Sequence, residues 1–135
     1  MAGEEHNLFI YGTLMVPDVM QTVTGRLFET VPATLSGYTR YRIKRHVYPG
    51  IIPTEFGYVD GLLCRAVDND SLQRLDAFES EVYNRRNVLV HLADNDKVEA
   101  FTYVIAQRYK HLLSNDDWSL ARFEQQHLQR YLAGI

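Results

Sequence analysis

Residues 8–14, Leu-Phe-Ile-Tyr-Gly-Thr-Leu, form the stretch that decides the fold of this chain. Its first four residues are apolar or aromatic strand formers without polar alternation, a pattern typical of a short strand buried on both faces. Glycine and threonine interrupt the run, and Pro17 then follows at a position suited to the first turn of a helix. The stretch therefore predicts a buried first strand that stops abruptly, followed by a helix over residues 17–23 that Gly25 ends.

The rest of the chain contains more strand patterns than helix patterns. We expect one or two strands over residues 33–45, a loop over 48–53, strands over 58–67, 83–92 and 98–106, a turn at 93–96, and helices over 72–78 and 118–132. Pro49 and Pro53 argue for the loop, because proline cannot donate to a central strand ladder. Residues 68–71 are capping residues that precede the second helix. Gly61 predicts a bulge or a close backbone approach within a continuous strand, although Asp60-Gly61 would also suit a hairpin turn.

The order of these elements narrows the fold class. No helix is predicted between residues 33 and 67, which excludes a regular βαβ winding. The order strand, helix, several strands, helix, two strands, helix instead favours an α+β fold. We expect an antiparallel or mixed, barrel-like sheet flanked by short helices.

The composition is that of an ordinary globular domain. With 135 residues, 46% of them hydrophobic and 23% charged, the chain fits a single domain over residues 1–135, of which residues 1–6 are expected to be flexible. Lys and Arg number 14 against 17 Asp and Glu, a net charge of −3. This balance argues against general nucleic-acid binding, which needs a basic face to displace counterions.

The cysteine content and the hydropathy pattern bear on the compartment. Cys64 is the only cysteine, so the chain forms no internal disulfide and no cysteine-based metal site. The first residues lack the basic and apolar regions of a signal peptide, and no apolar run reaches the roughly 18–20 residues that cross a bilayer. We expect a cytoplasmic protein that does not interact with a membrane.

Several common site patterns are missing from the sequence. The five histidines do not show the spacing of a zinc hydrolase helix, and neither a Gly-rich phosphate loop nor a Gly-x-Ser-x-Gly elbow is present. The basic stretch over residues 40–46 interleaves charges with aromatic residues, as RNA-binding segments do. An alternating strand with one solvated basic face explains it as well, and the acidic total favours that interpretation.

One candidate binding site is the segment Tyr11, Gly12, Thr13 and Leu14, where the first strand ends. Its backbone N–H groups leave the sheet ladder and need other acceptors. A positive φ at Gly12 would aim successive N–H groups into one concavity, which suits an anion such as a carboxylate. A strand that simply ends in a glycine turn is common, so this structural explanation stays open.

A candidate catalytic residue is Glu79, at the end of the predicted helix over residues 72–78. Burial beside Phe78 and a position at a helix C-terminus both disfavour the ionised carboxylate, which suits a group that exchanges protons near neutral pH. Asp76 lies three residues earlier and shares a helix face with it. A solvated helix end, with Glu79 paired to Arg74 or Arg85, would explain the same residues.

Together these motifs resemble the gamma-glutamylcyclotransferase-like family, and most of all its branch of plant avirulence-induced-gene-like proteins and their bacterial relatives. The resemblance spans the chain from about Asn7 to the last helix. It is carried by residues 8–14, Leu-Ser-Gly-Tyr at 35–38, Val-Tyr-Pro-Gly-Ile at 47–51, Val-Asp-Gly at 59–61, Leu-Asp-Ala-Phe-Glu at 75–79 and Tyr-Asn-Arg at 83–85. Two departures are Thr13, where many relatives carry serine, and Ser80, where glycine is frequent.

The resemblance implies a small mixed barrel with a pocket at one end. It implies that backbone N–H groups of residues 11–14 hold the α-carboxylate of a γ-glutamyl substrate and that Glu79 is the catalytic residue. The implied reaction is an intramolecular aminolysis that releases an amine and 5-oxoproline. Because one substrate supplies both nucleophile and electrophile, the reaction needs no metal and no cofactor. The N–H groups of the same loop, or a nearby hydroxyl such as that of Tyr83, would be placed to stabilise the developing oxyanion.

Two other functions fit the same sequence. A non-catalytic small-molecule binding module would keep the pocket without turnover, since one fold serves many functions. An RNA or protein interaction domain would use the basic stretch over residues 40–46. For the cyclotransferase we expect a small-molecule γ-glutamyl partner, no nucleic acid, no membrane, and a monomer or weak homodimer.

Overall fold

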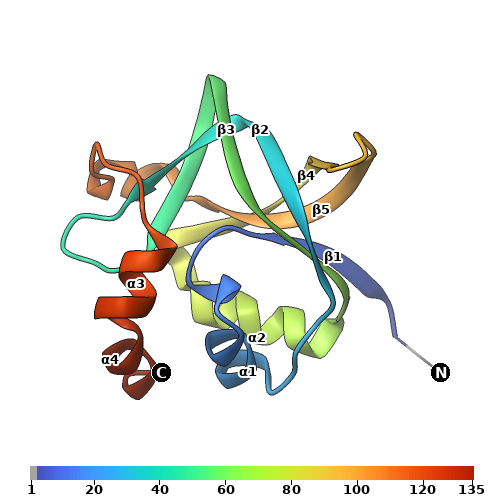
Figure 1. Ribbon diagram of the computed structural model, residues 1–135, viewed down its shortest axis with the longest axis horizontal. Coiled ribbons are helices and arrows are strands. Elements are labelled where there is room, and N and C mark those ends of the chain that lie inside the picture. The colour runs from blue at the N-terminus through green and yellow to red at the C-terminus, as the bar shows by residue number, and fades with distance from the viewer. Residues whose placement is uncertain (1–2) are drawn as a thin grey trace.

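A computed structural model describes residues 3–135 of the chain. Its strands are β1 (Glu5–Ile10), β2 (Thr30–Arg42), β3 (Pro49–Asp68), β4 (Tyr83–Leu92) and β5 (Lys97–Ile105). Its helices are α1 (Pro17–Thr24), α2 (Asn69–Glu79), α3 (Leu120–Gln126) and α4 (Leu128–Ala133), with short 3-10 turns η1 (Thr13–Met15), η2 (Ser80–Val82) and η3 (Gln107–Leu112). In Figure 1 the strands lie above α1 and α2, while α3 and α4 lie to the left.

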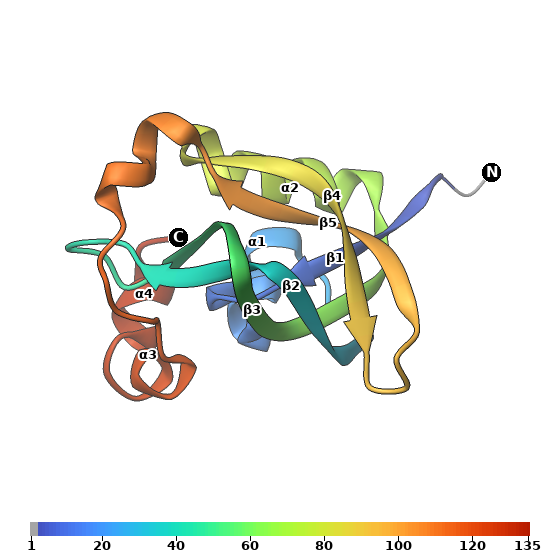
Figure 2. The ribbon, with the colours of Figure 1, turned by 90° about the horizontal axis from the view of Figure 1, so that it is seen from above.

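The five strands form a closed barrel in the order β1-β3-β2-β4-β5, with β5 returning to β1 (Figure 2). The neighbouring pairs are antiparallel except β1 and β5, which run parallel where Leu8 pairs with Phe101. The predicted α+β fold, with a mixed and largely antiparallel sheet flanked by short helices, is confirmed.

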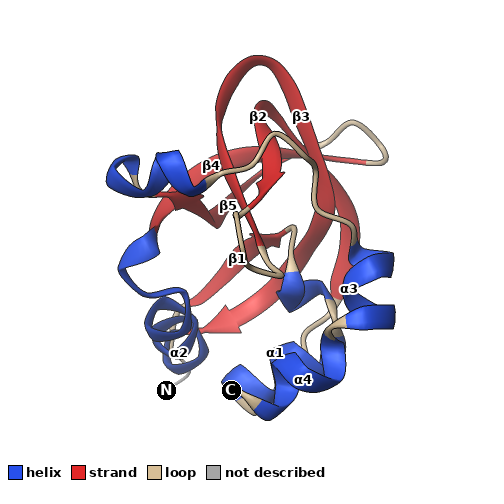
Figure 3. Ribbon diagram, turned by 90° about the vertical axis from the view of Figure 1, so that its left-hand side faces the viewer, coloured by secondary structure: helices blue, strands red, loops and turns tan. Residues whose placement is uncertain are grey.

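Residues 8–11, the predicted first strand, are buried on both faces, as expected. Phe9 and Tyr11 belong to a core cluster made of strand residues, which fills the barrel. Leu8 and Ile10 belong to a second cluster, where the outside of the barrel packs against the helices. Figure 3 shows α1 and α2 along this side of the sheet. Because alternate residues of a strand point to opposite faces, all four positions must be apolar to serve both clusters.

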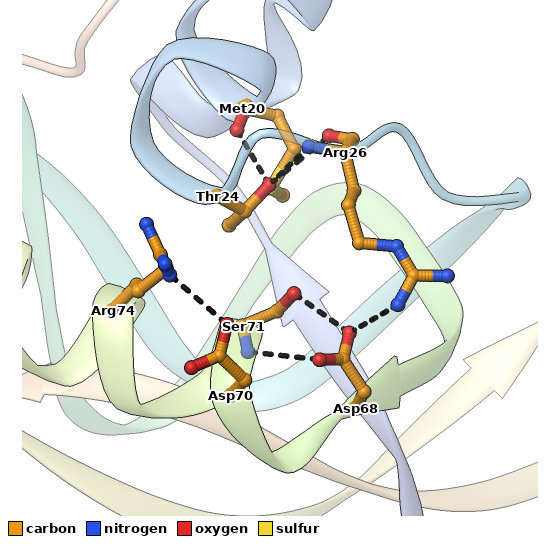
Figure 4. A network of polar contacts seen from close by, with 7 residues as sticks. All are labelled: Met20, Thr24, Arg26, Asp68, Asp70, Ser71 and Arg74. Atoms are coloured by element: carbon orange, nitrogen blue, oxygen red, sulfur yellow. Dashed lines mark hydrogen bonds and ion pairs between the residues drawn. The ribbon is translucent and has the colours of Figure 1, made fainter.

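Helix α2 begins at the cap that the sequence predicts. Asp68 accepts hydrogen bonds from the Ser71 backbone amide at 3.1 Å and from the Ser71 hydroxyl at 2.6 Å (Figure 4). Arg26, just after α1, pairs with the same carboxylate at 2.8 Å and links the two helices. Leu75 is fully buried in the outer cluster. The cap and this buried face fix the start and rotation of α2, and with them the position of its last residue, Glu79.

The loop predicted over residues 48–53 is wrong, because most of it belongs to β3. Pro49 pairs with Arg42 and Pro53 with Tyr38 in the β2–β3 ladder. The pairing of β3 with β1 begins only at Leu62, so the first part of β3 has an open side. A proline whose nitrogen faces that side removes no hydrogen bond from the ladder.

Gly61 lies within continuous β3, and the hairpin alternative is wrong. It pairs with Ala33 of β2, and a Cβ at this position would collide with the carbonyl oxygen of Ile10. The close backbone approach predicted from the sequence is therefore confirmed, because β1 crosses β3 at the place where β3 lacks a side chain.

The two ends of the chain differ from the predicted boundaries. The single helix expected over residues 118–132 is wrong: α3 and α4 are separated at His127, whose φ of −126° and ψ of −18° are not helical. Phe123 and Leu128 are five positions apart, a spacing that does not continue one helical stripe. Of the residues expected to be flexible, Glu5 and His6 pair with β3, while residues 1–2 lie outside the described part.

None of the helices in residues 3–135 combines the length and the apolar character needed to cross a membrane.

We expect Gly61→Ala to destabilise the protein by about 1–3 kcal/mol, since the added methyl group forces β1 and β3 apart. Gly134→Ala is the matched control, because its Cβ would lie 3.6 Å from the nearest atom. The control should change the free energy of unfolding by less than about 0.5 kcal/mol. Urea denaturation followed by the fluorescence of Trp118 measures both, and equal values for the two variants would contradict the close approach.

Candidate active site

A cavity of about 240 Å³ opens where β1 and β5 end and β4 begins. Its lining includes the predicted binding segment, residues 11–14, and the predicted catalytic residue Glu79. Residues from these two distant parts of the sequence therefore share one cavity. Tyr48, Tyr103 and Tyr131 complete much of the remaining wall.

Gly12 marks the turn away from the sheet, but not by the predicted backbone conformation. Its φ is −133°, so the positive φ expected for a glycine nest is wrong. Glycine is required here for space, since a Cβ would lie 2.8 Å from Cγ of Pro49. The side chain of Pro49 thus closes over the turn, and both residues line the cavity.

The backbone amides of this turn have no acceptor among the residues that the structure describes. Gly12, Thr13 and Leu14 are all buried, yet no group in residues 3–135 accepts a hydrogen bond from their N–H groups. Buried amides without an acceptor are rare, so their presence in a cavity wall favours an external anion as their partner. Arg40 Nη1 donates to the carbonyl oxygen of Tyr11 at 2.8 Å, and the hydroxyls of Thr13 and Tyr131 lie 3.2 Å apart. These contacts hold the turn in place.

Glu79 is the last residue of α2, and the chain turns sharply after it. Ser80 has a φ of +61° and a ψ of −162°, a conformation that favours glycine. This strained turn lets Glu79 line the cavity while the chain continues into η2. Burial of the Glu79 carboxyl, and then the nearby negative charge of Asp76, raise its pKa to about 8. Near neutral pH the group exists in both protonation states, which suits proton transfer.

The salt bridges around α2 test the interpretation in which Glu79 pairs with a nearby arginine. Arg74 pairs with Asp70 at 3.0 Å, and Arg85 pairs with Asp76 at 3.1 Å. The alternative in which Glu79 pairs with either arginine is therefore wrong. Asp76 also accepts a hydrogen bond from the Tyr103 hydroxyl at 2.7 Å, which keeps this second carboxylate satisfied beside Glu79.

Five tyrosines line the cavity around Glu79: Tyr11, Tyr48, Tyr83, Tyr103 and Tyr131. Burial is the largest cause of the raised pKa of each, and the Glu79 carboxylate raises every one of them as well. All five hydroxyls therefore lie within electrostatic reach of Glu79. The Tyr83 hydroxyl donates a hydrogen bond to the carbonyl oxygen of Pro49 at 2.6 Å. Its proton is therefore already engaged, although the sequence suggested that this hydroxyl stabilises an oxyanion.

Sequence reasoning missed several residues that build this site. Arg40 was assigned to a solvated basic face, but its side chain pairs with Asp117 at 2.8 Å and supports the turn at Tyr11. Tyr48 lies in the Val-Tyr-Pro-Gly-Ile stretch that carries the resemblance, but no role was predicted for it, and Tyr131 belongs to none of the motifs. The signal available was compositional: nine tyrosines are many for 135 residues. Among residues 3–135 no group of three or more His, Cys, Asp or Glu is placed to hold a metal ion.

We expect Glu79→Gln to stabilise the fold, and increasingly so as the pH rises. The folded chain keeps the Glu79 proton up to a pKa of about 8, whereas the unfolded chain releases it near 4.5. Between these values the unfolded state binds fewer protons, so the stability contributed by this group falls with rising pH. Glutamine does not titrate, so the variant does not lose this stability as the pH rises.

Thermal denaturation at about pH 4, 6 and 8.5 measures this effect, because the difference in Tm between variant and wild type should grow across the series. Glu124→Gln, at an exposed position of α3, is the matched control. A Tm difference that stays constant with pH for Glu79→Gln would contradict the raised pKa.

Three comparisons with known proteins point to one family. The family model described as gamma-glutamyl cyclotransferase, AIG2-like, matches residues 8–120. AIG2-like protein D of Arabidopsis thaliana is 36% identical over 129 residues, which are 94% of this chain and 84% of that protein. A solution structure of an Arabidopsis thaliana protein is 33% identical with a TM-score of 0.73, covering 96% of this chain and 87% of the other. A solved gamma-glutamyl cyclotransferase shares the fold at 14% identity, with a TM-score of 0.69 over 98% of this chain and 88% of its own. The chain therefore belongs to the gamma-glutamyl cyclotransferase, AIG2-like family.

Proposed function

We propose that the protein is a γ-glutamylcyclotransferase, which converts a γ-glutamyl amine or peptide into 5-oxoproline and a free amine. One observation carries the proposal: Glu79 and the unpartnered amides of Gly12, Thr13 and Leu14 line the same cavity. The amides donate hydrogen bonds to the α-carboxylate of the substrate. Glu79 accepts a proton from the α-ammonium group, which is bonded to the same carbon atom as that carboxylate.

The proposed reaction closes a ring within the substrate. Glu79 takes a proton from the α-ammonium group, and the freed nitrogen attacks the γ-carbonyl carbon. A new C–N bond forms, and the attacking nitrogen then loses a second proton to water. Glu79 returns the first proton to the departing nitrogen as its bond to the γ-carbon breaks, and the released amine takes up the second proton in solution. The proton taken up equals the proton given back, so Glu79 ends as it began. Fixing the α-carboxylate orients the two reacting atoms and supplies several kcal/mol of barrier lowering.

Tyr48 is the residue that we assign to the developing oxyanion. It lines the cavity, and its ring is stacked on His46 at 4.9 Å between centroids. Within residues 3–135 its hydroxyl has no hydrogen-bond partner, unlike the hydroxyls of Tyr11, Tyr83 and Tyr103. A free O–H donor beside the reacting carbonyl is suited to stabilise negative charge there.

The raised pKa of Glu79 favours an enzyme over a binding module. A site that only binds a γ-glutamyl group gains from a permanently ionised carboxylate beside the ammonium. Burial instead raises the Glu79 pKa to about 8, which opposes the ionised form and favours proton exchange near neutral pH. Action in a reducing cytoplasm and a monomeric or weakly dimeric state stay predictions.

A panel of γ-glutamyl amines and dipeptides, assayed for 5-oxoproline, tests the proposal. We expect turnover by the wild type and a loss of at least about hundredfold in kcat for Glu79→Gln, which keeps the shape but cannot carry the proton. The kcat/KM of the wild type should rise up to about pH 8, where Glu79 ionises.

Folded wild-type protein that releases no 5-oxoproline from any substrate would disprove the activity. If glutamate-like ligands then raise its Tm without product, the binding module is the correct function. Full activity of Glu79→Gln would be consistent with the cyclotransferase activity but would disprove the proton-transfer role of Glu79.

Tyr48→Phe should lower kcat by about hundredfold while KM changes little, because the lost hydroxyl acts on the transition state. Tyr58→Phe is the matched control, since Tyr58 is 67% exposed on β3. Steady-state kinetics on the best substrate of the panel measure both variants. Equal kcat values for Tyr48→Phe and wild type would refute the assignment.

A further inference from the structure

We propose that Arg40 is a positioning residue that strengthens the binding of the substrate's α-carboxylate. It acts without touching the substrate, by polarising the peptide group between Tyr11 and Gly12. The inference rests on the proposed function, which places the α-carboxylate at the amides of residues 12–14. It adds to that function the source of positive charge for this end of the site.

The proposed function brings an anion into a cavity whose wall contains no cation. Among the described residues that line the cavity, none is Lys, Arg or His, and Glu79 is the only Asp or Glu. A negative charge that leaves water without a counter-charge is strongly disfavoured. Positive charge for the α-carboxylate therefore has to come from behind the wall.

Arg40 reaches the wall from behind. It does not line the cavity, but its Nη1 donates to the carbonyl oxygen of Tyr11 at 2.8 Å. That oxygen and the N–H of Gly12 belong to one peptide group, and the C=O and N–H of a trans peptide point in opposite directions. A hydrogen bond donated to the oxygen polarises the group and makes its N–H a stronger donor, as in cooperative chains of hydrogen bonds.

Asp117 and Trp118 fix the guanidinium of Arg40 in this position. Both carboxylate oxygens of Asp117 accept from it, Oδ1 from Nε at 2.8 Å and Oδ2 from Nη2 at 3.3 Å. The Trp118 amide donates to Asp117 Oδ1 at 2.7 Å, and the centroid of the Trp118 ring lies 5.6 Å from Cζ of Arg40. Trp118 is itself buried, and its Nε1 donates to the carbonyl oxygen of Val47 at 2.6 Å. The planar fork of arginine suits such a set of partners.

The ion pair with Asp117 does not cancel the charge of Arg40 at the peptide group. The Asp117 side chain is 65% exposed, whereas that of Arg40 is 18% exposed. Water therefore screens the negative end of the pair more than the positive end. Burial and then the charge of Glu79 raise the pKa of the Tyr11 hydroxyl, while the charge of Arg40 lowers it. The positive charge thus acts on a group that lines the cavity.

Two substrates that differ only at the anchored end test the inference: the panel substrate with the highest kcat/KM and its analogue with an α-carboxamide in place of the α-carboxylate. We expect Arg40→Met to lower the ratio of kcat/KM, carboxylate over carboxamide, by about tenfold, which corresponds to about 1.4 kcal/mol. The α-carboxylate is bound in the ground state and the transition state alike, so KM should rise with little change in kcat. A turn that had merely come apart would lower kcat as well.

Arg42→Met is the matched control for the loss of an arginine from β2. The Arg42 side chain pairs with Asp116 at 3.7 Å, and its other polar contact is with its neighbour Ile43. Because an exposed ion pair contributes little, the ratio should stay within about twofold of the wild type.

Two further variants separate charge from packing. Arg40→Lys keeps a cation that can donate to the Tyr11 carbonyl but loses the two-point pairing with Asp117, and it should keep at least about a third of the wild-type ratio. Arg40→Gln is neutral and should lose the ratio as Arg40→Met does. It replaces Arg40→Met if circular dichroism shows that the latter does not fold.

Binding of the product provides a measurement that needs no turnover. Calorimetric titration with L-5-oxoproline and with its carboxamide, L-5-oxoprolinamide, gives the carboxylate preference as a ratio of two Kd values. We expect the wild type to bind the carboxylate more tightly, and Arg40→Met to lose about tenfold of that preference.

The outcomes separate this inference from the proposed function. If no panel substrate yields 5-oxoproline but the titrations show the expected loss, the proposed function is disproved and the role of Arg40 in carboxylate binding is supported. Turnover with an unchanged ratio in the folded neutral variant supports the function and overturns the inference. An equal loss in Arg40→Lys or in Arg42→Met, or a wild type without carboxylate preference in both measurements, also overturns it.

Discussion

The two-sided burial of β1 is the constraint on which the rest of the structure depends. Phe9 and Tyr11 fill the barrel, while Leu8 and Ile10 hold the helices against its outer surface. A strand that serves two cores cannot slip by one residue, because a slip would exchange the two faces. Its end is therefore fixed in space, and so is the turn at Gly12 that follows. The packing of this strand therefore sets the position of the predicted binding segment, residues 11–14.

A second set of contacts, independent of β1, fixes the position of Glu79 at the same cavity. The Asp68 cap and the buried Leu75 fix α2, and Ser80 turns the chain away at the end of the helix. Burying a carboxyl without a cation costs stability, and the raised pKa of Glu79 expresses that cost. Asp76 adds negative charge but has Arg85 and Tyr103 as its own partners. Among the described residues Glu79 thus has no paired cation in a wall of tyrosines, and a carboxyl with so strongly raised a pKa in a cavity is a candidate functional group.

Much of the fold could be read from the sequence because local patterns carried it. The apolar run before Gly12, the capping residues before α2, and the turn residues that separate β4 from β5 are signals that depend on neighbours along the chain. Predictions failed where distant partners decided the outcome. The prolines of β3 are tolerated because its first part has an open side, and Gly12 is needed because Pro49 closes over it. Neither fact is visible within any short window of sequence.

The sequence by itself determined the buried first strand, its stop at Gly12, and a glutamate at the end of the second helix, since strand, turn and cap signals are local. Only the tertiary structure decided that the amides of residues 12–14 and Glu79 share a cavity, that Arg74 and Arg85 pair elsewhere, and that five tyrosines surround the carboxyl. The physical reason is that the pKa of Glu79 depends first on burial, which the assembled fold creates, whereas the second cause, the charge of Asp76, lies on the same helix and is visible in the sequence. Chemistry at this site is therefore a property of the assembled fold.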